Sequence, residues 1–290
     1  MNIGFHIKKD KHDSIADAIR SSAKKFDITC GQIYLFGPRS LKQNDYDEEE
    51  LKLAIEETKM DIAVHSSYFL SPWDLSKKQI KLVVRELVAA QNIGAKWLVI
   101  HLPASCDHET IITAIKKIRK EIAKTIGTTN VILLLEHKAH KPYDDDDDDP
   151  KSSTSAVGLA HLASLITQAD TMKVGLCLDT AHIFVSNSYN TLEQKNKVEQ
   201  YIAEMGQTAI DLVALIHYNG SYNKFGSGKD KHAIPFCEDD RIWSDEKAGA
   251  KSWVAKFGRQ CPFIIECNRG SKNELKYAIS QTKSFIDQAE

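Results

Sequence analysis

The chain has 290 residues, of which 42% are hydrophobic and 27% are charged, values typical of a globular protein with a large core. It contains no run of 18 apolar residues, so no membrane partner is expected, and residues 1–7 lack the pattern of a secretory signal. We therefore expect an intracellular protein, with cytoplasm and nucleus left open. The six cysteines form no C-x-x-C pair, which argues against a thiolate zinc knuckle and a disulfide framework.

Six consecutive aspartates, Asp144–Asp149, dominate the formal net charge of −2, and the other residues together carry +4. A nucleic-acid partner is therefore not excluded, and bound cations would raise the positive balance further. The polar stretch at residues 141–155 is predicted to be an acidic loop insertion, because strand and helix patterns resume on both sides of it. The aspartate run is expected to be solvated rather than a metal site.

Eight short, β-rich apolar runs alternate with helical patterns along the chain. The runs are residues 3–7, 32–36, 62–65, 97–101, 131–136, 174–179, 212–217 and 262–266. Most of them are continuously hydrophobic, which is typical of parallel strands covered on both sides. Ser76 is predicted to cap the third helix and Gly94 to stop it, and the sixth helix is predicted to end at Gly206.

Eight strand–helix units in this length predict a single α/β domain over residues 1–290, a (βα)₈ TIM-type barrel. A doubly wound sheet is the alternative fold. That fold usually carries a glycine-rich phosphate loop after its first strand, but Gly4 is followed here by Phe5, His6 and Ile7.

Metal-ligand residue types close the last six predicted strands. They are His65, His101, Glu136, Asp179, His217 and Glu266. Chemistry in a barrel lies at the C-terminal ends of the strands, where an unpaired charge after an apolar run would be costly. Three further candidates, His182, Asp230 and His232, lie in the loops just beyond.

Nine imidazole and carboxylate ligands suit zinc, with manganese or iron possible, and they are too many for one ion. Each residue also has a simpler explanation when it is taken alone. Asp179 could cap the next helix, and Asp230 with His232 could form a loop salt bridge. The other six histidines lack this placement, and His137 should point to the side of the strand opposite Glu136. These six are His6, His12, His108, His137, His140 and His161.

The motifs that surround these positions run in order along the chain. They are His65-Ser66-Ser67-Tyr68, His101-Leu102-Pro103, Glu136, Leu178-Asp179-Thr180-Ala181-His182, His217-Tyr218-Asn219, Asp230-Lys231-His232 and Ile265-Glu266. Together they resemble the endonuclease IV family of abasic-site endonucleases. Gly220, where the family commonly has an aspartate, and Lys231, where it has an arginine, mark a divergent member.

The resemblance implies a cluster of three zinc ions, with manganese or iron possible in part. One ion is held by His65, His101 and Glu136. Glu136 bridges to a second ion, held with Asp179, His217 and Glu266. The third ion is held by His182, Asp230 and His232.

The resemblance also implies an activity, namely hydrolysis of the phosphodiester 5′ of an abasic site in base excision repair. The products are a 3′-hydroxyl and a 5′-deoxyribose phosphate, and Glu136 is the implied catalytic residue. The partner is double-stranded DNA containing abasic sites, bound by a monomer. Arg39 and Tyr68 match positions that probe the minor groove, whereas basic residues in the loops are expected to contact phosphates. The basic residues are Lys8, Lys224, Lys229 and Arg269.

Two other functions fit parts of the pattern. A metal-dependent sugar isomerase on a similar barrel would use the quartet Glu136, Asp179, His217 and Glu266, but it would not need the other five candidates. A non-catalytic DNA-binding scaffold on a decayed barrel is the second possibility. The complete set of ligand residue types argues against it.

Overall fold

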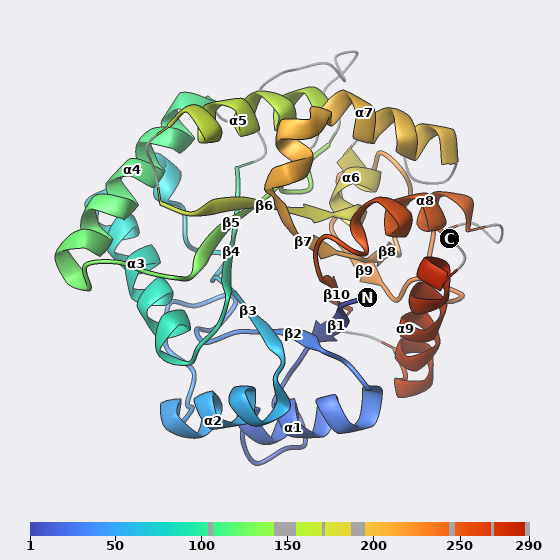
Figure 1. Ribbon diagram of the computed structural model, residues 1–290, viewed down its shortest axis with the longest axis horizontal. Coiled ribbons are helices and arrows are strands. Elements are labelled where there is room, and N and C mark those ends of the chain that lie inside the picture. The colour runs from blue at the N-terminus through green and yellow to red at the C-terminus, as the bar shows by residue number, and fades with distance from the viewer. Residues whose placement is uncertain are drawn as a thin grey trace.

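A computed structural model describes residues 1–103, 107–141, 155–169, 172–186, 195–243, 247–267 and 270–287. Eight parallel strands close into a barrel in the order β1-β10-β7-β6-β5-β4-β3-β2 (Figure 1). The strands are β1 Ile3–His6, β2 Cys30–Ile33, β3 Asp61–His65, β4 Trp97–His101, β5 Ile132–Glu136, β6 Val174–Asp179, β7 Val213–His217 and β10 Phe263–Ile265. The predicted TIM-type barrel is therefore confirmed.

An outer ring of helices encloses the barrel (Figure 1). These helices are α1 Ile15–Phe26, α2 Glu48–Thr58, α3 Lys77–Asn92, α4 His108–Thr125, α5 Ala156–Gln168, α7 Lys195–Leu212, α8 Ala248–Phe257 and α9 Lys272–Asp287. Shorter elements in the loops are η1 Pro72–Asp74, α6 Thr180–Ser186, and the antiparallel pair β8 Gly220–Ser221 and β9 His232–Ala233. No helix in the described ranges is both long and apolar enough to cross a bilayer.

Side-chain caps start several of these helices, including α3, where the sequence predicts a cap at Ser76. The hydroxyl of Ser76 accepts a hydrogen bond from the backbone N–H of Gln79 at 3.2 Å, and Ser14 caps α1 in the same way. Gly94, with φ of 77°, turns the chain just after α3 ends. Caps of this kind satisfy backbone donors that have no partner inside the helix.

The barrel interior contains a separate apolar cluster. Its buried members are Cys30, Ala63, Trp97, Val99, Leu134, Cys177, Leu215 and Ile264. Side chains alternate between the two faces of a strand, so the residue two positions further along points to the same side. His65, His101 and Glu136 each lie two residues further along their strand than a member of this cluster, namely Ala63, Val99 and Leu134 in turn. The apolar cluster therefore supports a polar layer at the C-terminal ends of the strands.

The structure corrects some predicted boundaries. The second strand is Cys30–Ile33, not residues 32–36, because Gly31 and Gln32 are buried in the barrel although neither is apolar. Leu35 and Phe36 extend the hydrophobic run because they pack in the core beyond the strand. Gly206 breaks the regular helix with φ of 71° and ψ of 162°, but helical structure resumes as far as Leu212.

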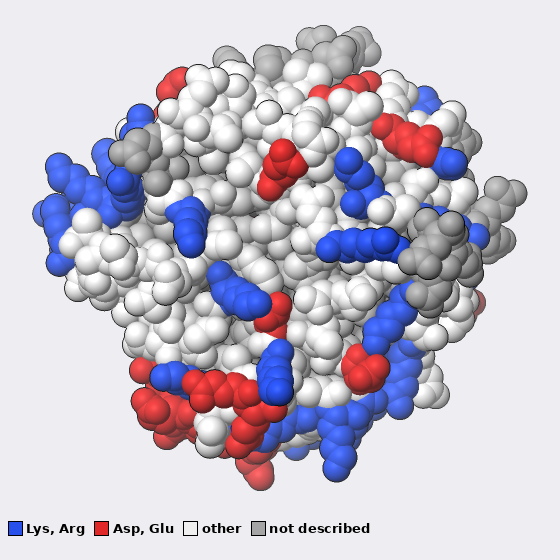
Figure 2. Space-filling model, in the orientation of Figure 1, with Lys and Arg blue, Asp and Glu red and all other residues white. Residues whose placement is uncertain are grey.

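Charge is unevenly distributed over the face shown in Figure 2. Acidic side chains gather over α2, and basic ones lie over the side formed by α3 and α4. The net charge of −2 is therefore a poor guide to the local potential. The predicted acidic run Asp144–Asp149 and the predicted DNA contact Arg269 lie outside the described residues.

Candidate metal centre

The six predicted strand-end residues lie together at one end of the barrel. His65, His101, Glu136, Asp179 and His217 are the final residues of β3 to β7 in turn, and Glu266 directly follows β10. All of them except His101 are buried, and Glu136 and His217 have no exposed surface. Parallel strands in register bring residues that are far apart in the sequence to a common level, as in the pairing of His101 with Glu136.

One group of candidate ligands is formed by His65, His101 and Glu136. The Nε2 atoms of His65 and His101 lie 3.2 and 2.9 Å from the same carboxylate oxygen, Oε2 of Glu136. The other ring nitrogen of His65, Nδ1, lies 2.8 Å from the carbonyl oxygen of Ser66, to which it can donate. That hydrogen bond would leave Nε2 of His65 with a free lone pair facing the carboxylate, as a metal ligand requires.

A second group shares Glu136 and adds Asp179, His217 and Glu266. Nδ1 of His217 lies 2.9 Å from Oε1 of Glu136 and 3.1 Å from Oε2 of Glu266. Asp179 Oδ2 lies 3.8 Å from the same nitrogen. The two oxygens of Glu136 thus face different groups, and one carboxylate is able to join them.

A third group consists of Asp179, His182 and His232. His182 lies on the buried helix α6, and Asp179 accepts the backbone N–H of His182 at 2.9 Å. Asp179 therefore caps this helix and also faces the cluster. Asp230 reaches the same place, with oxygens 2.8 Å from Nε2 of His232 and 3.4 Å from Nε2 of His182.

The donor set fits divalent cations. The Nε2 atoms of His182 and His232 are buried and have no hydrogen-bond partner within the described part of the chain, although carboxylate oxygens surround them. Buried polar atoms usually have partners, and imidazole nitrogens among carboxylates suit zinc, manganese or iron. Asp179 belongs to two of the three groups. It is thus a second shared carboxylate beside Glu136, which the sequence analysis did not expect.

Charge pairing shifts the pKa values of these residues strongly. Burial alone would lower the pKa of His217, but the carboxylates of Glu266 and Glu136 raise it to about 9. For His232, burial is likewise outweighed by Asp230 and Asp179, and the pKa rises to about 10. Protonated imidazoles cannot bind a metal ion, so metal binding to these side chains would release protons and weaken as the pH falls.

Two polar side chains to which the sequence analysis gave no role in the site hold the candidate ligands in place. The amide of Asn219 donates to Asp179 Oδ2 at 2.7 Å, and its carbonyl oxygen accepts the backbone N–H of Glu266 at 2.8 Å. Gln32 contacts both His217 and Glu266 from β2. A polar residue buried inside a strand was the available signal for Gln32, but the misplaced strand boundary hid it.

The prediction that His6 lacks a strand-end position is wrong. His6 is the last residue of β1 and lines the cavity above the candidate ligands. The apolar run continues to Ile7, so the sequence pattern placed the strand end one residue too late. His137 stays outside the three groups, where its Nε2 accepts the backbone N–H of Asp179 at 3.0 Å and burial lowers its pKa to about 3.

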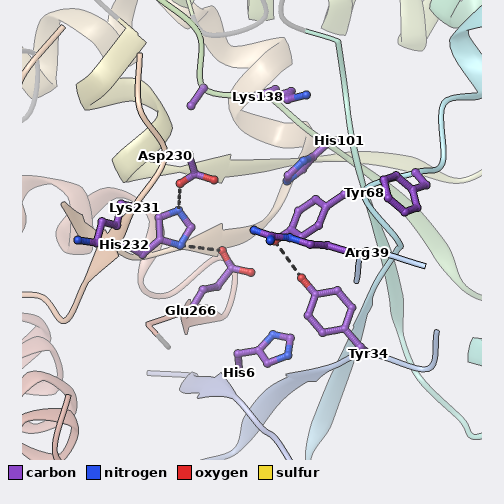
Figure 3. Close-up of a pocket in the computed structure, with 12 residues that line it drawn as sticks. His6, Tyr34, Arg39, Tyr68, His101, Lys138, Asp230, Lys231, His232 and Glu266 are labelled. Atoms are coloured by element: carbon purple, nitrogen blue, oxygen red, sulfur yellow. Dashed lines mark hydrogen bonds and ion pairs between the residues drawn. The ribbon is translucent and has the colours of Figure 1, made fainter. Parts of the chain in front are cut away.

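A cavity of about 620 Å³ opens above the metal-ligand groups (Figure 3). Its lining includes His101, Asp230, His232 and Glu266 from these groups, together with His6, Tyr34, Arg39, Tyr68, Phe69 and Lys138. Tyr68 and Phe69 are 48% and 55% exposed, so this rim presents two aromatic rings to solvent. Arg39 and Tyr68, the two residues expected to probe DNA, therefore meet at the mouth of this cavity.

The other predicted DNA contacts lie further out. Lys8 lines an adjoining cavity of about 680 Å³ that also contains Arg39 and Tyr68. Lys224 and Lys229 are exposed on the loop that carries Asp230. Lys138 and Lys231, which the sequence analysis did not propose as DNA contacts, line the main cavity.

Comparison with known proteins agrees with this geometry. The model of the xylose isomerase-like TIM barrel family matches residues 21–284. The chain belongs to this family. Its homologues include a probable AP endonuclease of African swine fever virus (isolate Tick/Malawi/Lil 20-1/1983), which is 29% identical over 281 residues, covering 90% of this chain and 88% of the relative.

Relatives of the endonuclease IV type recur in both sequence and structure. A probable endonuclease 4 of Mesomycoplasma hyopneumoniae (strain 7448) is 29% identical over 245 residues, covering 80% of this chain and 82% of the relative. The crystal structure of endonuclease IV from Thermus thermophilus superposes with a TM-score of 0.74 at 20% identity, covering 99% of this chain and all of that chain. The resemblance found in the motifs is confirmed by these homologues, and the structural likeness supports the fold.

Proposed function

We propose that the protein is a metal-dependent DNA-repair endonuclease that hydrolyses the phosphodiester 5′ of abasic sites. The proposed products are a 3′-hydroxyl and a 5′-deoxyribose phosphate, and the proposed cofactor is a cluster of three zinc ions, with manganese or iron possible in part. The proposed substrate is double-stranded DNA bound by a monomer. Relatives named AP endonuclease and endonuclease 4 support the class of activity.

The observation that carries the proposal is the set of three adjoining ligand groups that share Glu136 and Asp179. A site for one ion would use only some of these buried imidazoles and carboxylates as ligands. Divalent ions, when bound, lower the pKa of water into the neutral range and offset charge that develops on a phosphate. A cluster of them therefore suits hydrolysis of a phosphodiester without a protein nucleophile.

The chain's own residues would divide the remaining work. Glu136, the proposed catalytic residue, faces two ligand groups with its two oxygens and fixes their separation. Asp179, Gln32 and Asn219 hold the surrounding side chains through the hydrogen bonds described above. The exposed tyrosine and arginine line the cavity rim, and their proposed role is to enter the DNA minor groove.

A sugar isomerase is the second candidate, because the family is described as xylose isomerase-like. The group of Glu136, Asp179, His217 and Glu266 could hold one ion by itself. This candidate gives no purpose to the histidines at the ends of β3 and β4, or to Asp230. It predicts one or two ions per chain rather than three.

The test pairs a cleavage assay with elemental analysis. Metal-loaded protein should cut a duplex that contains one abasic site and leave the same duplex without the lesion intact. The ends of the fragments should be a 3′-hydroxyl and a 5′-deoxyribose phosphate, and about three ions per chain should be bound. A reproducible stoichiometry of one, together with turnover of a sugar and no cleavage, would establish the isomerase instead.

A further inference from the structure

The ring of inward-facing residues at the C-terminal end of the barrel extends beyond the candidate ligands. His6 ends β1, and Gln32 lies opposite it on β2 in the register of the two strands. Both follow a small residue two positions earlier, Gly4 and Cys30, as the candidate ligands follow the apolar cluster. His6 and Gln32 thus complete the circle of polar side chains on the two strands that carry no candidate ligand.

The side-chain amide of Gln32 contacts three of its neighbours at once. Its carbonyl oxygen, Oε1, lies 2.9 Å from Nε2 of His217. Its nitrogen, Nε2, donates to Oε1 of Glu266 at 2.5 Å and lies 3.3 Å from Nδ1 of His6. Gln32 has no exposed surface, so bulk water does not compete for these three hydrogen bonds.

These contacts fix the proton positions on both imidazoles. An amide oxygen only accepts hydrogen bonds, so Nε2 of His217 donates, and when this ring is neutral its lone pair is on Nδ1, which faces the ligand group. The amide nitrogen of Gln32 only donates, and it has two hydrogens for its two partners. One of these hydrogens is donated to Glu266. The other is donated to Nδ1 of His6, which must therefore be an acceptor.

His6 must therefore carry its proton on Nε2 when the ring is neutral. Burial lowers the pKa of His6 well below its usual value, and the neighbouring His65 and Lys8 act in the same direction, so the neutral form prevails. The ring of His6 packs 4.6 Å from that of Tyr34 and lines the cavity above the ligand groups (Figure 3). Nε2–H is the one polar hydrogen that this side chain can offer to a molecule in the cavity.

We propose that Gln32 is a positioning residue that orients His217 and Glu266 and holds His6 so that its Nε2–H donates a hydrogen bond to an oxygen of the substrate strand. The oxygen belongs either to a phosphate or to the deoxyribose of the damaged nucleotide. The proposal rests on the proposed endonuclease function. It adds a substrate contact that lies outside the nine candidate ligands and depends on Gln32 for its direction.

The test compares two substitutions of His6 on an abasic duplex. His6→Phe removes the donor, and kcat/KM should fall about 10- to 100-fold, the usual effect of losing a hydrogen bond to a charged group. His6→Gln keeps an N–H near the position of Nε2 and should recover most of the loss. The bound metal should stay the same in both variants, and His161→Phe on the outer helix α5 controls for the loss of an imidazole elsewhere.

A double-mutant cycle with Gln32→Met separates positioning from simple packing. The single variant should weaken metal binding about 10- to 100-fold, as expected when the partner of a ligand is removed. In this background, at saturating metal, His6→Phe should change kcat/KM by less than about threefold, since His6 is no longer held. Equal effects of His6→Phe in both backgrounds would overturn the role of Gln32.

Two further readouts complete the experiment. A duplex with a tetrahydrofuran abasic analogue lacks the hydroxyl at C1′, so a lost effect of His6→Phe on it indicates a contact with that hydroxyl, and an unchanged effect indicates a phosphate or the ring oxygen, which both duplexes contain. If the wild-type protein cleaves no abasic duplex, the proposed function fails, but the positioning by Gln32 is still tested by ¹⁵N chemical shifts of His6. They should report a bare Nδ1 and a protonated Nε2 in the wild type, and a protonated Nδ1 would overturn the proposal. Full activity of His6→Phe would overturn the substrate contact.

Discussion

Two levels of the barrel interior, separated by two residues along the same strands, have opposite chemistry. On β3, β4 and β5 the lower level is Ala63, Val99 and Leu134, which belong to a buried apolar cluster. Two residues further on, the upper level is His65, His101 and Glu136, which are close enough to share an ion. The strand backbone is the same in both, so the side chains alone decide whether a level stabilises the fold or prepares a binding site.

The difference has an energetic meaning. Burial of apolar side chains stabilises the barrel without needing specific partners. Buried charges, in contrast, destabilise the fold unless each is paired. The upper level meets this requirement because its imidazoles contact its carboxylates, and no apolar packing could replace their role as ligands. The lower level is therefore expected to control stability, and the upper level is expected to control metal binding and turnover.

Glu136→Gln should produce the largest effect on activity. The substitution keeps the shape of the side chain but removes the charge that faces two ligand groups. We expect turnover on an abasic duplex to fall by more than about 10³-fold, about 4 kcal/mol of transition-state stabilisation, while DNA binding is largely kept. Single-turnover cleavage and a binding assay measure the two quantities separately.

The matched control is Glu109→Gln, which makes the same chemical change on the exposed surface of α4. It should leave turnover and metal content as they are. A Glu136→Gln variant that retained more than about a tenth of wild-type turnover, a loss below about 1.4 kcal/mol, would remove this glutamate from the catalytic role.

Leu134→Ala tests the lower level on the same strand. Leu134 has no exposed surface and packs inside the barrel, where its side chain lies against Gly175. Truncation should reduce the free energy of unfolding by about 2–5 kcal/mol, the range for a buried leucine, and leave the metal stoichiometry unchanged. Denaturant titration and elemental analysis check the two statements. Loss of bound metal without loss of stability would contradict the division between levels.

Glu86 is a buried carboxyl group that lies outside both levels of the barrel interior. It lies on α3 with no exposed surface, and the nearest cation is Arg85, 3.8 Å away. Burial raises its pKa from 4.5 to about 7, so the folded protein binds this proton more tightly than the unfolded chain does. Its contribution to stability should be complete below about pH 4.5 and should be lost as the pH rises through 7.

The substitution Glu86→Gln removes this titration. Comparing the free energy of unfolding of variant and wild type at pH 5 and pH 8 should show a gain for the variant at the higher pH of up to about 3 kcal/mol. Taking the difference at each pH cancels the titration of the histidines near the metal groups. A difference that stays constant with pH would show that Glu86 is ionised throughout the range.

Sequence periodicity was sufficient for the barrel because eight short apolar runs that alternate with helical patterns leave few alternative folds. It also identified the strand ends of β3 to β7, where a charged or imidazole side chain closes an apolar run. It failed for His6 and Gln32, since an apolar run that continues past the strand, or a polar residue within it, hides the inward-facing position. Contacts between strands distant in sequence, such as the one from Gln32 to Glu266, emerge only from the closed barrel.

The rim above the upper level should affect recognition of damage and not chemistry. Arg39 and Tyr68 line the cavity mouth, and the hydroxyl of Tyr68 accepts a hydrogen bond from Tyr34 at 3.0 Å. An abasic duplex has already lost one stacking partner and bends easily, so side chains that enter the minor groove can exploit this weakness. Intact DNA resists the same deformation.

Combined replacement, Tyr68→Ala with Arg39→Ala, should weaken binding to an abasic duplex about tenfold or more, since contacts between bases and aromatic rings contribute about 1–3 kcal/mol each. Binding to intact duplex should weaken less, and metal content should not change, because neither residue belongs to the ligand groups. Equal weakening on both duplexes would mean that the pair only grips the backbone. No weakening on either would place recognition elsewhere on the rim, where the exposed Phe69 is the next side chain to replace.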